Sequence, residues 1–215
     1  VTPDGHRMTL CANTGLLADI PRAIERGAEG VGLYRSEVAF MSTSRLPSES
    51  EQTQLYREQL EAFHPLPVSM RTLDIGGDKP LSYFPIKEAN PYLGWRGIRV
   101  TLDHPEIFMV QIRAMLKASL GLDNLRILLP MISGTLELDD AQYLIHRAWG
   151  ELHEEGFAVS MPKIGVMIEV PAAVYQAPEL LAMCDCISVG SNDLTQYLLA
   201  VDRNNARVAA LYDYL

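Results

Sequence analysis

Residues 163–170, Lys163-Ile164-Gly165-Val166-Met167-Ile168-Glu169-Val170, form a short apolar run that ends beside a carboxylate. Apolar runs of this length that are rich in β-branched residues are typical of a strand buried on both faces, as in a parallel sheet. Similar runs recur along the whole chain. Seven strands are therefore expected, near Met8–Ala12, Gly30–Tyr34, Val68–Leu73, Trp95–Val100, Arg126–Pro130, Lys163–Val170 and Cys184–Val189.

Amphipathic stretches with apolar residues at three- and four-residue spacing separate these runs and predict helices. The helices are expected at about Leu16–Arg26, Ser48–Phe63, Pro105–Leu120, Leu136–Glu155, Ala172–Met183 and Asp193–Ala200. Alternation of strand and helix predicts a parallel sheet covered by helices, in either a doubly wound open sheet or a closed (β/α)8 barrel. A full barrel needs about 250 residues. Seven strand units in 215 residues favour an α/β barrel without its last unit, and the open sheet stays the alternative.

Composition and charge exclude several classes of function. The chain has 18 basic and 27 acidic residues and a net charge of −9, which argues against nucleic-acid or membrane-surface binding. Three cysteines are too few for a disulfide framework, which favours a reducing, cytoplasmic setting. No apolar run approaches membrane-spanning length. The chain begins without Met and ends in a helix-like segment, so we expect a piece of a longer protein.

Arginines interrupt or end three of the apolar runs: Arg35, Arg71 and Arg96. Any one of them is more simply a solvated strand end or a structural ion pair. In a parallel α/β domain, however, the ligand site lies at the carboxyl ends of the strands, where these arginines would converge. Guanidinium groups bind carboxylate and phosphate bidentately, so the set suits a small anion that carries both groups, as phosphoenolpyruvate does.

Carboxylates at two successive strand ends predict a metal site. Glu169 could be a buried carboxylate satisfied by hydrogen bonds or by an arginine, and Asp193 could cap the helix that follows it. Taken together, they could supply the two protein carboxylates that Mg2+ commonly takes, with the amide of Asn192 and the helix amino terminus holding phosphate. Arg203 is by default an exposed loop residue and gains interest only beside this cluster.

Other recognised sites are absent from the sequence. Residues 76–79 (Gly-Gly-Asp-Lys) form a glycine-rich turn but lack the spacing of a Walker phosphate loop. The five histidines show no metal-ligand spacing, and no Gly-x-Ser-x-Gly elbow occurs.

Six segments resemble the carboxyl-terminal domain of Enzyme I of the phosphoenolpyruvate-dependent phosphotransferase system, in family order and along essentially the whole chain. They are residues 27–37 (Gly-Ala-Glu-Gly-Val-Gly-Leu-Tyr-Arg-Ser-Glu), 71–79 (Arg-Thr-Leu-Asp-Ile-Gly-Gly-Asp-Lys), 90–99 (Asn-Pro-Tyr-Leu-Gly-Trp-Arg-Gly-Ile-Arg), 165–171 (Gly-Val-Met-Ile-Glu-Val-Pro), 188–197 (Ser-Val-Gly-Ser-Asn-Asp-Leu-Thr-Gln-Tyr) and 200–205 (Ala-Val-Asp-Arg-Asn-Asn). Residues 4–7, 94–99 and 202–205 are more similar to the nitrogen-regulatory type than to the sugar-transport type.

The resemblance implies a TIM-like (β/α)8 barrel of the phosphoenolpyruvate/pyruvate type, with residues 1–215 truncated before the eighth strand and no amino-terminal phosphohistidine domain. Such a barrel binds phosphoenolpyruvate and Mg2+ and passes the phosphoryl group to a histidine of that separate domain, and then to a phosphocarrier protein. The family is a homodimer through this domain.

The resemblance also implies roles for individual residues. Arg35, Arg71 and Arg203 would hold phosphate and carboxylate oxygens, with Arg96 facing the phosphoryl group. The Asn192 side chain would contact the phosphate, beside Asp193 at the substrate. Glu169 and Asp193 would ligate Mg2+.

The family's catalytic cysteine belongs to a Cys-Gly-Glu motif that is absent here, so the chain alone is expected to be catalytically incomplete. Two alternative functions remain. One is the equivalent barrel of pyruvate phosphate dikinase or phosphoenolpyruvate synthase, and the other is a non-catalytic dimerisation module.

Overall fold

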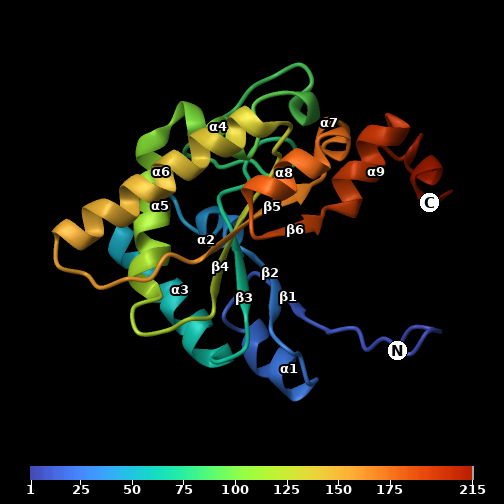
Figure 1. Ribbon diagram of the computed structural model, residues 1–215. Helices are drawn as coiled ribbons and strands as arrows, with labels where there is room; N and C mark the ends of the chain where they lie inside the picture. The colour runs from blue at the N-terminus through green and yellow to red at the C-terminus, as the bar shows by residue number, and fades with distance from the viewer. Residues whose placement is uncertain (215) are drawn as a thin grey trace.

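One parallel sheet organises the chain in the computed structural model, which describes residues 1–214 (Figure 1). Within these residues the sheet has six strands, and strands that are consecutive in sequence are neighbours in space, in the order β1-β2-β3-β4-β5-β6. The strands are β1 (Ala12–Thr14), β2 (Val31–Arg35), β3 (Val68–Arg71), β4 (Leu125–Leu129), β5 (Lys163–Ile168) and β6 (Cys186–Val189).

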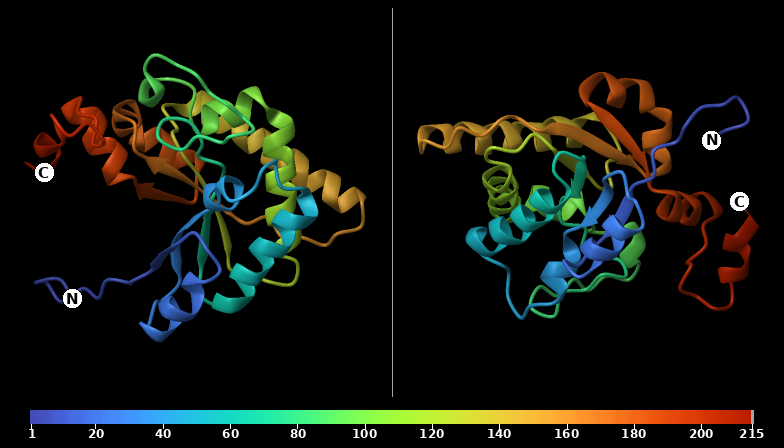
Figure 2. Two further views of the ribbon diagram at one scale, coloured as in Figure 1. Left: turned by 180° about the vertical axis from the view of Figure 1, so that it is seen from behind. Right: turned by 90° about the horizontal axis from the view of Figure 1, so that it is seen from below.

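The strand order separates the two folds that the sequence left open. A doubly wound sheet reverses its strand order at a switch point, whereas a (β/α)8 barrel keeps sequential order. All neighbouring pairs here are parallel and sequential. The sheet curls, and α3 (Glu49–Phe63), α5 (Pro105–Ala118) and α6 (Thr135–Glu154) cover its convex side, while the two termini lie on the opposite side (Figures 1 and 2). The described residues therefore form a curled half-barrel, as in part of a TIM-like barrel.

The remaining helical segments are short and lie mostly at the ends of strands. They are α1 (Asp19–Glu25), α2 (Glu37–Met41), η1 (Pro91–Leu93), α4 (Ile98–Asp103), α7 (Pro171–Tyr175), α8 (Ala177–Met183), α9 (Ser191–Leu199) and η2 (Ala209–Tyr214).

The main core lies between the sheet and the three long helices. Leu60 of α3, Ile112 of α5 and Ile145 of α6 are completely buried against strand residues such as Val68 and Ile127. Full burial of one such side chain contributes about 1.5–3 kcal/mol. Helix α3 begins at a capping box, in which the Ser48 side chain accepts from the Glu51 backbone N–H and Glu51 accepts from that of Ser48.

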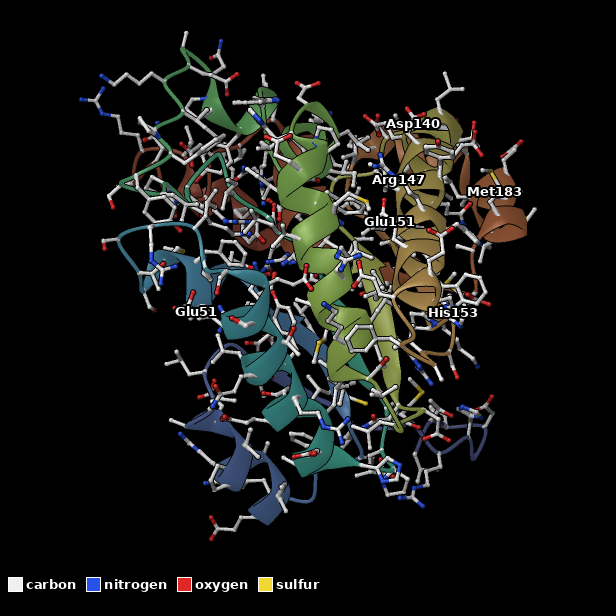
Figure 3. The ribbon with its side chains drawn as sticks, turned by 90° about the vertical axis from the view of Figure 1, so that its left-hand side faces the viewer. Glu51, Asp140, Arg147, Glu151, His153 and Met183 are labelled. Carbon is white, nitrogen blue, oxygen red and sulfur yellow. The ribbon has the colours of Figure 1, made fainter. Side chains whose placement is uncertain are left out.

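The outer surface of the long helices carries mixed charges. Arg113 of α5 binds Glu49 of α3 at 3.0 Å and Glu155, which follows α6, at 2.8 Å, so one guanidinium joins three helices. Figure 3 shows this side of the molecule, where Arg147 and Glu151 project from α6; they form an exposed ion pair at 2.9 Å. Exposed pairs of this kind contribute about 0–1 kcal/mol, so burial of the apolar faces holds the helices.

The predicted strand Trp95–Val100 is wrong, because this run turns at Gly97 and continues as α4. Strand β3 pairs directly with β4, Arg71 opposite Leu128, which leaves no place for another strand between them. Gly97 has a φ of +58°, and a Cβ there would lie 2.9 Å from Cγ of Met131. A short apolar run cannot be distinguished from a buried helix by periodicity alone. Residues 1–214 therefore form six strands, where the sequence predicted seven.

Several element boundaries also differ from the predictions. The first strand is Ala12–Thr14 and not Met8–Ala12, because Ala12 pairs with Val31 while Met8 and Leu10 are exposed. The helix predicted over Ala172–Met183 is two helices, α7 and α8, which meet at Gln176.

Two remaining features are the state of the cysteines and the length and polarity of the helices. Cys11, Cys184 and Cys186 are all free thiols. Among residues 1–214, no helix combines the length and the apolar character that crossing a membrane would require.

Candidate functional site

The predicted arginines and carboxylates gather at the carboxyl edge of the sheet. Arg35 ends β2 and Arg71 ends β3, and the two residues are register partners. On the neighbouring strands, Ile168 of β5 pairs with Val189 of β6, so Glu169 and Gly190 leave the sheet side by side. This edge is where ligands bind in parallel α/β domains.

Arg71 is buried and anchors the first part of the site. Its guanidinium donates to Glu37, the first residue of α2, and lies 3.1 Å from Asp74. Burial by itself would lower the pKa of this guanidinium, but the carboxylates of Asp74, Glu37 and Glu169 more than offset burial and raise it. Its Nε has no hydrogen-bond partner among the described residues, so Arg71 keeps a free donor.

Asp74 is completely buried and is the centre of the cluster. Its carboxylate contacts Arg71, accepts a bond from Lys79, and lies 3.3 Å from Nε of Arg96. Burial would raise the pKa of this carboxyl, but the three cations outweigh burial and lower it far below its usual range. Asp74 is therefore an anion at any physiological pH, and it fixes the three cations around it.

Arg96 joins this group to α9 across the site. Its Nη1 and Nη2 donate to Oδ1 and Oδ2 of Asp193 at 2.8 and 3.1 Å, which is a bidentate pair. Arg203, in the segment after α9, donates from Nη1 to the same Oδ1 at 3.3 Å and from Nη2 to Asp78 at 3.3 Å. Residues from the segments that follow β3, η1 and α9 thus meet at one place.

Glu169 is buried next to these ion pairs but does not join them. Its Oε1 accepts the backbone N–H of Met131 at 2.7 Å, and its Oε2 has no hydrogen-bond partner within residues 1–214. Burial, followed by repulsion from Asp74, raises the pKa of Glu169 to about 7. A buried carboxylate with an unsatisfied oxygen is costly and favours a cation beside it.

The backbone approaches this carboxylate closely on two sides, and at Met131 it has an unusual conformation. Met131 has a φ of +58°, which is uncommon for a residue with a side chain, and it directs its N–H at Glu169. On the other side, a Cβ at Gly190 would lie 2.5 Å from Oε2 of Glu169. Strained backbone of this kind concentrates at functional sites.

The ion pairs connect four basic and four acidic side chains of the described chain, which we call the charged network. It consists of Arg71, Lys79, Arg96 and Arg203 with Glu37, Asp74, Asp78 and Asp193. The network is neutral, and Glu169 adds one negative charge when it is ionised. Its arginines are therefore already compensated, and a multiply charged anion would need an added cation.

The donor set fits a hard divalent cation. The free Oε2 of Glu169 is a carboxylate oxygen, and Oδ2 of Asp193 accepts only one bond from Arg96. Mg2+ needs only one or two protein carboxylates and completes its shell with water and ligand oxygens. Across the described residues, no cluster of three or more His, Cys, Asp or Glu side chains is placed to bind a metal. The site therefore offers a ligand pair that a bound anion would have to complete.

The structure brings together five of the residues predicted from the sequence and leaves two apart. Arg71, Arg96, Glu169, Asp193 and Arg203 meet at the charged network. Two others lie at its rim.

Arg35 is exposed, and none of the described residues forms an ion pair with it. Asn192 is also exposed, and its backbone and side-chain oxygens accept bonds from the Tyr212 hydroxyl at 3.1 Å. Neither side chain contacts the charged network in this arrangement.

The capping interpretation of Asp193 is wrong. Helix α9 begins at Ser191 with Gly190 as its N-cap residue, and no side chain caps it. Asp193 lies within the first turn and turns inward to Arg96. The default interpretation of Arg203 as an exposed loop residue is wrong as well, since it is half-buried and paired.

Four further members of the network were missing from the predicted site: Glu37, Asp74, Asp78 and Lys79. For Lys79 and Asp74, the sequence signal that indicates their contact is the Gly76-Gly77 turn between them. With φ of +98° and +62°, these glycines reverse the chain so that Lys79 returns to Asp74.

A set of hydrogen bonds made by the neutral side chain of Gln111 supports the backbone next to the charged network. Gln111 of α5 is buried, accepts the backbone N–H of Leu73 at 2.7 Å, and donates to Ser36 and Tyr56 at 3.1 Å. Ser36 precedes Glu37, and Leu73 precedes Asp74. Gln111 therefore fixes the backbone positions of two carboxylates of the network.

The chain is similar in sequence to proteins of known family. The chain is 52% identical over 212 residues to a protein of Salmonella typhimurium named phosphoenolpyruvate-dependent phosphotransferase system, and the match covers 98% of this chain and 28% of that protein. It is 44% identical over 214 residues to the phosphoenolpyruvate-protein phosphotransferase of Staphylococcus carnosus, which covers 99% of this chain and 37% of that protein. The chain thus spans well under half of either relative. The family model described as PEP-utilising enzyme, PEP-binding domain, matches residues 1–215, and the chain belongs to this family.

Proposed function

We propose that the charged network and Glu169 bind phosphoenolpyruvate together with Mg2+, and that the chain is the phosphoenolpyruvate-binding part of a phosphoenolpyruvate-protein phosphotransferase. The observation that carries the proposal is that Arg71, Arg96 and Arg203 meet in one network of ion pairs beside Glu169, whose Oε2 has no hydrogen-bond partner among the described residues. Buried guanidinium groups recognise phosphate and carboxylate, and the free oxygen calls for a cation.

Each arginine has a distinct task in this proposal. Arg71 uses its unpartnered Nε and its fixed orientation between Glu37 and Asp74 to hold one anionic group of the ligand. Arg96 is held rigidly by two carboxylates and stabilises the negative charge of the phosphoryl group as it transfers. Arg35 and Asn192 lie at the rim of the edge, and we propose that they contact the outer oxygens of the ligand.

Glu169 and Asp193 would hold Mg2+ by carboxylate oxygens. When bound, Mg2+ would neutralise phosphate and enolate oxygens, which the neutral network does not do on its own. The name phosphoenolpyruvate-protein phosphotransferase of one relative supports transfer to a protein. We propose a histidine of a separate domain as acceptor, followed by a phosphocarrier protein.

Two finer assignments are part of the same proposal. The first is the nitrogen-regulatory type, which residues 4–7, 94–99 and 202–205 support because they are more similar to that type than to the sugar-transport type. The second assignment is that the parent protein forms a homodimer. The names of the relatives favour phosphotransfer to protein over a dikinase, a synthase or a non-catalytic dimerisation module.

Isothermal titration of phosphoenolpyruvate, with Mg2+ and with EDTA, tests the proposal. We expect binding with Mg2+ and at least a tenfold weaker affinity without it. Arg71→Lys is expected to lose about 1.5–3 kcal/mol of binding free energy. An ammonium group has no donor that corresponds to the free Nε, and it does not keep the fixed orientation of the guanidinium between Glu37 and Asp74.

Arg147→Lys is the matched control, since Arg147 is exposed on the outer side of α6, where it pairs with Glu151 (Figure 3). Its affinity should equal that of the wild type. Equal affinity of the Arg71→Lys variant would remove Arg71 from the site, and absence of binding in Mg2+ would overturn the proposed function.

A further inference from the structure

The acidic members of the charged network differ in how much water reaches them. The side chains of Asp74, Glu37 and Asp193 are 0%, 3% and 9% exposed, whereas that of Asp78 is 25% exposed. A carboxylate that leaves its partner must be rehydrated, and this is easiest at the surface. Asp78 is the network carboxylate that can turn to solvent with the smallest rearrangement.

Asp78 also lacks a short contact in the network, whereas Glu37, Asp74 and Asp193 each have one. Its Oδ2 lies 3.3 Å from Nη2 of Arg203 and 3.5 Å from Nδ2 of Asn204. Both distances exceed the usual range for charge-assisted hydrogen bonds, about 2.7–2.9 Å. By contrast, the bidentate pair of Arg96 and Asp193 has bonds of 2.8 and 3.1 Å.

The backbone around Arg203 is held without Asp78. Its N–H donates to the buried side chain of Gln196 at 3.1 Å, and Val201 N–H donates to the Gln196 carbonyl at 3.0 Å. Ala200 ends α9 in a left-handed conformation and so directs the chain back over the site. Loss of Asp78 would therefore free Nη2 of Arg203 without displacing the backbone, while Nη1 keeps its bond to Asp193.

We propose that Asp78 is an exchangeable counter-ion that occupies Arg203 until an anionic group of the ligand replaces it. This inference rests on the proposed function, because it names the carboxylate that phosphoenolpyruvate displaces. Asp78 then lowers the affinity for the ligand because it competes with the ligand anion for Nη2 of Arg203. Asp78 is thus a residue that sets affinity at this site without being required for binding.

Titration of phosphoenolpyruvate in Mg2+ with three variants tests the inference. Asp78→Asn is expected to bind about fivefold more tightly than the wild type, the effect of losing one partly exposed competing charge. Arg203→Gln is expected to bind more weakly, and Asp78→Asn combined with Arg203→Gln should bind no more tightly than Arg203→Gln alone. Glu58→Gln, an exposed site on α3, makes the same change in net charge and should leave the affinity unchanged.

The outcomes separate this inference from the proposed function. Binding by the wild type together with unchanged or weaker binding by Asp78→Asn overturns the exchangeable counter-ion alone. A gain from Asp78→Asn that persists in the Arg203→Gln background also overturns it, because the gain would then be a general charge effect. No binding by the wild type overturns the proposed function and this inference with it.

Discussion

Replacing Glu169 by Gln should make the protein more stable at neutral and alkaline pH and remove a part of its pH dependence. Glu169 is buried, one of its carboxylate oxygens has no hydrogen-bond partner among residues 1–214, and its pKa is raised from 4.5 to about 7. Glutamine has nearly the same shape and is neutral. Its side-chain carbonyl can still accept the Met131 N–H that now binds Oε1.

The magnitude follows from the shift. The folded protein binds the proton of Glu169 more tightly than the unfolded chain does, so between about pH 4.5 and 7 the folded state carries more protons. The contribution of Glu169 to stability is therefore complete below pH 4.5 and is lost as pH rises through 7. A difference of about 2.5 pKa units corresponds to about 3 kcal/mol. The variant should match the wild type near pH 4.5 and exceed it by up to about 3 kcal/mol at pH 8.

Urea unfolding of both proteins at pH 5, 6, 7 and 8, in EDTA, measures this difference directly. The quantity of interest is the difference in unfolding free energy between the two proteins at each pH, because other titrating groups then cancel. Glu58→Gln on the exposed face of α3 serves as the control and should show no pH-dependent difference.

A constant difference across this pH range would refute the reasoning, as would a variant that is less stable at pH 8. Either result would mean that Glu169 is solvated or compensated in the folded protein. Addition of Mg2+ provides a second measurement: it should stabilise the wild type more at pH 8 than at pH 5, and the Glu169→Gln variant less at either pH.

Three further substitutions test the local structure that positions the site. Gly97→Ala should destabilise the folded protein by more than about 1–2 kcal/mol, because Gly97 has a φ of +58° and a Cβ would lie 2.9 Å from Met131. The control is Gly121→Ala, where φ is +74° and nothing lies within 4 Å of the added Cβ, and it should lower the melting temperature clearly less. Equal losses of stability in the two variants would exclude the clash. Gln111→Leu should lower the unfolding free energy in urea by about 1–3 kcal/mol and weaken phosphoenolpyruvate binding, because it leaves the Leu73 N–H unpaired. Unchanged binding would mean that Gln111 contributes to stability alone. Ser48→Ala should cost about 1 kcal/mol by removing the cap of α3 and leave ligand affinity unchanged, and no loss of stability would show that Glu51 alone caps the helix.

Periodicity predicted the parallel α/β class and most of the elements correctly. The runs at Val68–Leu73 and Lys163–Val170 contain β3 and β5, and nearly all residues of these two strands are buried, as expected of strands covered on both faces. The run Trp95–Val100 was assigned wrongly. Its apolar content is equally compatible with a buried helix, and only the direct pairing of β3 with β4 shows that no strand fits there.

The sequence by itself determined which residue types would line the carboxyl edge of the sheet. Arg71, Glu169 and Asp193 each follow or end an apolar run, and the carboxyl ends of parallel strands share one edge, so their approach to one another follows from local pattern alone. The match to the PEP-binding family spans residues 1–215.

Only the tertiary structure decided how these charges are compensated. Sequence spacing does not show that Arg96, 97 positions before Asp193, binds it bidentately, or that Lys79 returns to Asp74 across a glycine turn. Nor does it distinguish the helix cap expected at Asp193 from the inward orientation that the structure shows. The reason is physical: the pairing of charges depends on burial and on distances across the fold, and burial removes the water that would otherwise satisfy each charge alone.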